Sequence, residues 1–176
     1  MEKYKELLKL ARETLECQFN RNSVKIRDII KKKFGKKGAC FVTLTIDGEL
    51  RGCIGSLEAH QELWKDVVAN AINAGFNDPR FNPISSDELK KIKIEISVLT
   101  SPEKLGIGKD VYDKIDNKMG IVLKKGWNSA TFLPQVWEQI PSKKEFLEHL
   151  SMKAGLSKDD WKEAQLDFYR VESCEE

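Results

Sequence analysis

The segment from Leu50 to Gly55, with the sequence LRGCIG, gathers the side chains of this chain that are best suited to chemistry. Arg51 offers a rigid fork of hydrogen-bond donors to an anion, and Cys53 is a potential nucleophile or metal ligand. Gly52 and Gly55 allow the backbone to approach a ligand closely or to adopt positive φ. This segment is therefore the first candidate for a binding or catalytic site.

A β-hairpin is predicted to position the segment. Residues 39–46 are rich in β-branched and aromatic side chains, and Asp47-Gly48 is a strong signal for a two-residue turn. Residues 49–54 then form the return strand. The candidate side chains would thus lie on a strand held by its neighbour, which restricts the directions in which they can point.

A regular register with this turn pairs Leu44 with Arg51 and Val42 with Cys53, so both candidate side chains would share the apolar face of the hairpin. Cys53 is then either a small buried hydrophobe or a thiol presented to a ligand. An unpaired arginine on an apolar face is costly. Arg51 therefore needs a bound anion or a carboxylate partner, and Glu95 is the partner that we expect.

Two further charged residues, Asp78 and Arg80, lie in a loop stiffened by prolines at residues 77–83. Such a loop can hold side chains toward a ligand, although an aspartate can equally cap a turn. Cys53 is the candidate catalytic residue, and the candidate ligand-binding residues are Arg51, Gly52, Gly55, Asp78, Arg80 and Glu95. The four cysteines show no CxxC spacing, so we expect no metal and no cofactor.

Hydrophobic periodicity predicts the remaining elements. Helices are expected at residues 2–16, 24–34, 61–76 and 143–154, and strands at residues 92–98, 120–125, 129–133 and 166–171. Helices and hairpins in this order predict an α+β fold with a mostly antiparallel sheet flanked by helices. We expect a single domain over residues 1–176, because no low-complexity segment interrupts the chain.

Composition limits the function classes. The chain has 30 basic and 28 acidic residues, so its formal net charge of +2 disfavours strong attraction to nucleic acid or to an anionic membrane. It lacks the run of roughly 20 apolar residues that a membrane span requires, and its beginning lacks the apolar core of a signal peptide. We therefore expect a cytoplasmic protein.

Six ordered blocks of the sequence together resemble the AMMECR-one domain family, and the resemblance spans nearly the whole chain. The blocks are FVTL at 41–44, LRGCIG at 50–55, DPRF at 78–81, EISVLT at 95–100, FLPQV at 132–136 and KAGL at 153–156. The resemblance implies an α+β fold with a larger and a smaller lobe, and the segment 50–55 near a cleft. It also implies Memo-like and radical S-adenosylmethionine proteins as partners, but no settled reaction.

Three hypotheses about function follow. The first is a recognition or accessory module that binds an anionic small molecule or a protein segment near Arg51, Gly52 and Cys53. The second is a cysteine-dependent enzyme that acts with the implied partners. The third is a weak nucleic-acid binder, based on Trp127 beside Lys124-Lys125. The sequence leaves open whether the protein is an enzyme.

Overall fold

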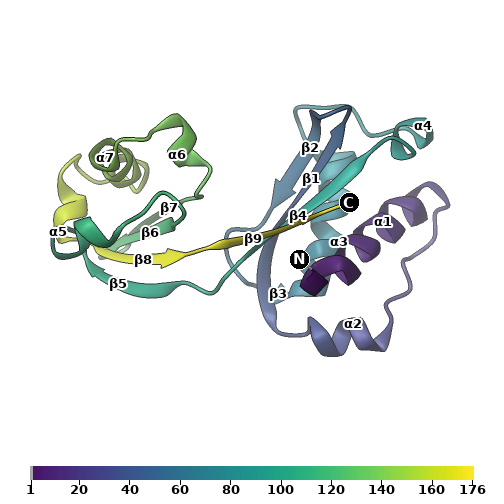
Figure 1. Cartoon of the computed structure of the whole chain (residues 1–176), viewed down its shortest axis with the longest axis horizontal. Coiled ribbons are helices and arrows are strands. Elements are labelled where there is room, and N and C mark those ends of the chain that lie inside the picture. The colour runs from purple at the N-terminus through teal and green to yellow at the C-terminus, as the bar shows by residue number, and fades with distance from the viewer. Residues whose placement is uncertain (1) are drawn as a thin grey trace. The chain divides into compact units, whose positions relative to one another are not determined.

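The computed structural model describes residues 2–176 and divides them into two compact units (Figure 1). The first unit consists of the chain up to Leu99 together with Glu172–Glu176, and the second is Thr100–Val171. Each unit combines helices with its own sheet. In the first unit, β1 (Lys37–Ile46) pairs antiparallel with β2 (Glu49–Gly55) and with β4 (Lys93–Leu99), and in the second unit all strand pairs are antiparallel. The predicted α+β class is confirmed, whereas the single domain stays a prediction.

In the first unit, a sheet with the strand order β2-β1-β4-β9 packs against two long helices, and a short strand β3 pairs with β1. The elements are η1 (Glu2–Tyr4), α1 (Lys5–Phe19), α2 (Asp28–Lys33), β1 (Lys37–Ile46), β2 (Glu49–Gly55), β3 (Gln61–Glu62), α3 (Leu63–Ile72), η2 (Asn73–Asn77), α4 (Ser86–Leu89), β4 (Lys93–Leu99) and β9 (Val171–Glu175). Segment η2 is a π-helical continuation of α3, so the helix predicted at residues 61–76 has two parts.

The core of the first unit lies between one face of this sheet and the helices. Apolar residues at helical spacing in α1 are buried together with alternate residues of β1 and β4, as the alternation of strand side chains requires. The fully buried strand residues are Cys40, Val42, Leu44, Ile94 and Ile96. We call the face of the sheet that carries these five side chains the inner face. The other side, the outer face, carries half-buried side chains such as Phe41, Thr43 and Cys53.

The hairpin turn forms as the sequence predicts, but the return strand pairs in a register that differs from the predicted one. Asp47 and Gly48 both have positive φ, 52° and 84°, as a two-residue type I′ turn requires. The strands then shift by one residue at a β-bulge, where Arg51 is the extra residue between the pairs Thr45–Leu50 and Leu44–Gly52. The predicted pairing of Cys53 with Val42 is therefore wrong.

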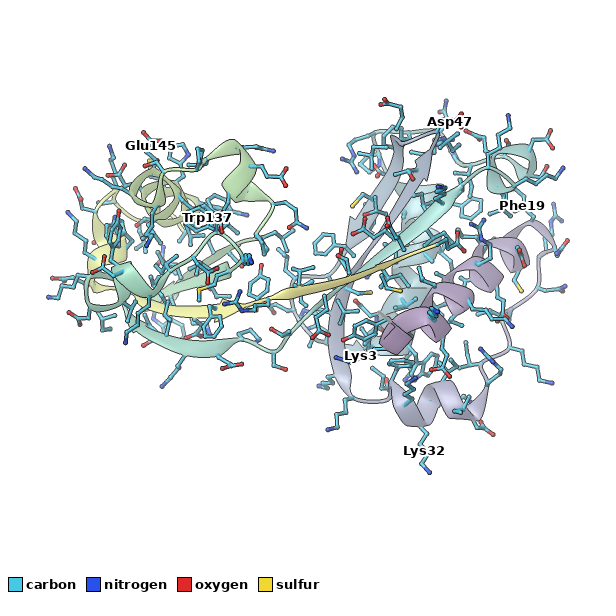
Figure 2. The ribbon with its side chains drawn as sticks, in the orientation of Figure 1. Lys3, Phe19, Lys32, Asp47, Trp137 and Glu145 are labelled. Atoms are coloured by element: carbon cyan, nitrogen blue, oxygen red, sulfur yellow. The ribbon has the colours of Figure 1, made fainter. Side chains whose placement is uncertain are left out.

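The second unit contains a sheet with the strand order β5-β8-β6-β7. Its elements are β5 (Glu103–Ile107), α5 (Gly108–Val111), η3 (Tyr112–Lys114), β6 (Gly120–Lys125), β7 (Asn128–Phe132), α6 (Val136–Gln139), α7 (Lys143–Lys153), η4 (Asp160–Glu163) and β8 (Gln165–Tyr169). Trp137, labelled in Figure 2, stacks on Phe146 with the ring centroids 3.7 Å apart in the core of this unit. The sequence did not predict β5, because its glycine at position 106 interrupts the strand pattern and its pairing with β8 is irregular.

Candidate functional site

The bulge at Arg51 places Cys53 on the outer face of the first sheet. Cys53 lies opposite Thr43 and not Val42, so its thiol points away from the apolar core and is half-buried. The expectation that Cys53 shares a face with Val42 and Leu44 is therefore wrong, because one inserted residue moves all later side chains to the opposite face. The sequence could not reveal the bulge, since the two-residue turn alone suits a regular ladder.

Cys53 belongs to a row of polar side chains that crosses the outer face. Thr43 lies between Cys53 on β2 and Glu95 on β4, so the outer two are about 10 Å apart. The Thr43 hydroxyl donates to Cys53 Sγ at 3.3 Å, and Glu95 Oε1 accepts from the Ser97 hydroxyl at 2.9 Å. Ser97 Oγ is also 2.9 Å from Ser173 Oγ on β9. We call these five residues the polar row.

A pair of charged side chains holds the Cys53 backbone from the edge of the sheet. The Cys53 N–H donates to Asp78 Oδ2 at 2.9 Å, and Arg80 Nη2 donates to the Cys53 carbonyl at 3.1 Å. Arg80 also donates to Asp78 from Nη2 at 2.7 Å and from Nε at 3.0 Å. These hydrogen bonds keep the pKa of the buried Asp78 carboxyl well below its usual range. Asp78 and Arg80, which we call the edge clamp, are thus brought to Cys53.

Arg51 is paired, but its partner is not Glu95. Its Nε donates to Glu88 Oε1 at 2.7 Å, and its Nη2 donates to the Asn82 carbonyl at 2.9 Å. Glu88 also accepts from the Ser85 N–H in the capping box that begins α4. The expected pair with Glu95 is wrong because the bulge turns Arg51 toward α4. Arg51 lowers the pKa of Glu88 to about 2.

The pair of Arg51 with Glu88 predicts a pH-dependent contribution to stability. Since the pKa of Glu88 falls from 4.5 to about 2 on folding, the contribution is complete above pH 4.5 and is lost as the pH falls through 2. Replacing Arg51 with methionine should raise the pKa of Glu88 and lower the free energy of unfolding at pH 7 by about 1 kcal/mol. Urea denaturation between pH 2 and 7 measures both effects.

The control for this prediction is Lys90→Met, which removes an exposed pair with Asp87 next to the same short helix. That variant should change the free energy of unfolding by less than about 0.5 kcal/mol at any pH. An Arg51→Met variant whose stability profile runs parallel to that of the parent would contradict a contribution from Glu88.

The two glycines of the segment serve close packing. A Cβ atom at Gly52 would lie 2.1 Å from the Ala74 carbonyl oxygen, and a Cβ atom at Gly55 would lie 2.2 Å from Cγ of Phe41. Gly52 thus allows η2 to approach β2, and Gly55 makes room for a ring on the outer face. Both positions exclude a side chain, whether or not a ligand binds nearby.

A buried carboxylate beyond the end of β2, Asp66, was not among the sequence candidates. Its oxygens accept from the Cys40 N–H at 2.9 Å and from Cys40 Sγ at 3.5 Å, and also from the side chains of Ser56 at 2.8 Å, Gln61 at 3.1 Å and Asn70 at 3.0 Å. Burial, followed by the nearby Asp66 charge, raises the pKa of the Cys40 thiol well above its usual value. The only sequence signal was an aspartate on the apolar side of α3.

The residues on which the nucleic-acid hypothesis rests do not belong to the polar row. Trp127 is fully exposed at the turn between β6 and β7. The adjacent Lys124 and Lys125 form ion pairs with Asp167 at 2.8 Å and with Asp160 at 2.6 Å, which offset part of the positive charge beside the indole. Within residues 2–176, no three His, Cys, Asp or Glu side chains gather as metal ligands, and no helix is long and apolar enough to cross a membrane.

Comparison with known proteins gives the family. The sequence profile of the AMMECR1 family matches residues 8–175, which is nearly the whole chain. The chain belongs to the AMMECR1 family. Protein NEQ441 of Nanoarchaeum equitans is 38% identical over 171 residues, which cover 94% of this chain and 95% of that protein. A protein of Aquifex aeolicus is 35% identical over 174 residues, with 94% and 87% covered.

The AMMECR1 fold is also present in a solved structure. The crystal structure of the uncharacterized protein PH0010 from Pyrococcus horikoshii has a TM-score of 0.78 to this chain at 30% identity, with 99% of this chain and 92% of that chain covered. The AMMECR1 resemblance inferred from the six sequence blocks is therefore confirmed. These relatives supply the family and the fold, but no reaction, so the function must be argued from the residues.

Proposed function

We propose that this AMMECR1 family member is a recognition module that binds an anionic group, carried by a small molecule or by a protein segment, at the polar row next to Arg80. The observation that carries the proposal is the edge clamp. A buried aspartate and an arginine together hold both backbone groups of one residue, Cys53. Such support is what a recognition site needs in order to keep its contacts at fixed positions.

Of the two arginines predicted to bind an anion, Arg80 is the better placed. The Arg51 side chain is only 16% exposed, and its donors are directed to Glu88 and to the Asn82 carbonyl. The Arg80 side chain is 53% exposed, and within the described residues its Nη1 has no hydrogen-bond partner. The ligand anion would therefore meet Arg80 Nη1, while the hydroxyl groups of the polar row orient its polar part.

The experiment is a thermal-shift screen of small carboxylates and phosphates, with each stabilising compound titrated against variants. Arg80→Ala should weaken a specific ligand by about tenfold, and Thr43→Val should weaken it to a smaller extent. The matched control is Arg170→Ala, because Arg170 is 44% exposed and pairs with Asp116 in the second unit. Unchanged affinity in a folded Arg80→Ala variant, or equal weakening in the control, would reject this site.

A second candidate, cysteine-dependent chemistry, is favoured by one contact. The Thr43 hydroxyl donates to Cys53 Sγ at 3.3 Å, so a polar group directly contacts the half-buried thiol on the outer face. Under this second hypothesis, Cys53 would carry a covalently bound group, and the Memo-like and radical S-adenosylmethionine proteins would supply or receive that group. Alkylation of the native protein between pH 5 and 9 tests it, since labelling of Cys53 only after unfolding would exclude this chemistry.

A further inference from the structure

An open hollow lies elsewhere in the first unit, beside the short helix α2. Its volume is about 680 Å³, which is within the range of roughly 300–1,000 Å³ that is typical of ligand pockets. It is lined by Lys25, Ile26, Arg27, Asp28, Lys31 and Trp64. None of these residues belongs to the polar row or to the edge clamp, so the hollow is a separate candidate site.

The lining of the hollow has an excess of positive charge. Its one carboxylate, Asp28, is paired with Lys31 at 3.3 Å on the exposed surface. Lys25 and Arg27 form no ion pair or side-chain hydrogen bond with any other residue in the described part of the chain. Two cations with unused donors thus lie at the edge of one hollow. Such a pair favours a ligand with a doubly charged anionic group, because guanidinium and ammonium groups bind phosphate oxygens strongly.

An aromatic side chain completes the lining. The indole of Trp64 is half-buried at the start of α3, and the ammonium group of Lys65 lies 5.3 Å from the centroid of one of its rings. Lys65 is itself held by Glu62 at 2.7 Å. With Ile26, the indole gives the hollow an apolar wall that suits a flat ring system. The ligand should therefore combine a planar ring with phosphate.

We propose that this hollow binds a free nucleotide, with its base against Trp64 and Ile26 and its phosphates at Lys25 and Arg27. A free nucleotide is favoured over a nucleic-acid strand because the net charge of the whole chain is only +2. This inference does not depend on the function proposed for the polar row.

The test is isothermal titration of the whole protein with ADP, pyrophosphate and adenosine. ADP should bind more tightly than either of its parts, because the ring and the phosphates contact different walls of the hollow. The double variant Lys25→Ala/Arg27→Ala should weaken ADP by about tenfold or more and leave adenosine unchanged. Trp64→Leu should reduce the affinity for ADP to that for pyrophosphate, whereas Trp64→Phe should retain most of it.

The matched control is Lys32→Ala/Lys36→Ala, which removes the same charge from the same part of the chain. Neither lysine lines the hollow, and Figure 2 shows the Lys32 side chain directed away from the rest of its unit. ADP affinity should be unchanged in this control. Absence of ADP binding, equal weakening in both double variants, or tighter binding of a short RNA strand than of ADP would each overturn the proposal.

Discussion

Replacing Asp66 with alanine is expected to lower the free energy of unfolding of the first unit by about 4 kcal/mol. The carboxylate accepts five hydrogen bonds and is only 3% exposed, so water cannot replace it. Alanine would leave the Cys40 N–H without its acceptor and would remove one partner each from Ser56, Gln61 and Asn70. Each buried donor left without a partner costs about 1–3 kcal/mol.

Asp66→Asn separates the hydrogen bonds of this network from its charge. The remaining oxygen can still accept from the Cys40 N–H, and the new amide can donate to the Ser56 hydroxyl. This variant should therefore lose only about 1 kcal/mol. The control Asp87→Ala removes an exposed carboxylate and should change the stability by less than about 0.5 kcal/mol.

Urea denaturation, followed by hydrogen exchange of the β1 amides, measures these changes in the first unit itself. Hydrogen exchange is needed because it reports on the first unit alone, and the two units need not unfold together. An alanine variant within 1 kcal/mol of the parent would mean that the network around Asp66 contributes little to folding.

The sequence predicts the elements of this fold better than it predicts which side chains face one another. Periodicity identified α1 and α3, and Asp47-Gly48 identified the hairpin turn, because each of these signals is local. The bulge at Arg51 lies next to Gly52, where η2 approaches the strand closely, and no local signal in the sequence marks that contact. One unpredicted residue in a strand was therefore enough to reverse the expected direction of Cys53.

The partners of the charged residues depended on the same bulge. Asp78 and Arg80 were identified from a proline-rich loop, and the structure brings both to Cys53. Glu88 was not among the sequence candidates, although a helix-capping glutamate near an arginine can serve both roles. Long-range pairing of this kind cannot be deduced from spacing in one sequence, because several carboxylates could reach the same arginine.

Replacing Asp78 with alanine is expected to lower the free energy of unfolding of the first unit by about 3 kcal/mol and to speed alkylation of Cys53. Asp78 accepts the Cys53 N–H and is nearly inaccessible to solvent, so its loss leaves that edge group of β2 unpaired. Arg80 would also lose its carboxylate, although its 53% exposure lets water compensate for part of that loss. The freed strand edge should open more often and present the thiol to the reagent.

The contribution of Asp78 to the free energy of unfolding should decrease as the pH falls. Because its folded-state pKa lies below the ordinary value of 3.8, the ionised carboxylate stabilises the fold above about pH 3.8, and this contribution declines as the pH falls toward the folded-state pKa. The difference between the parent and Asp78→Ala should therefore be largest near neutral pH and shrink under acid conditions. Asp78→Asn keeps an acceptor for the Cys53 N–H but removes the charge, so it should lose less stability than alanine.

The control for the edge clamp is Asp116→Ala, which removes a half-exposed aspartate paired with Arg170 in the second unit. It should leave both the alkylation rate of Cys53 and the stability of the first unit unchanged. If Asp78→Ala alters stability but not the alkylation rate, Asp78 supports the fold without positioning the thiol. If Asp78→Asn accelerates alkylation as much as Asp78→Ala does, the charge of the carboxylate, more than its hydrogen bond to the Cys53 N–H, holds the strand in place.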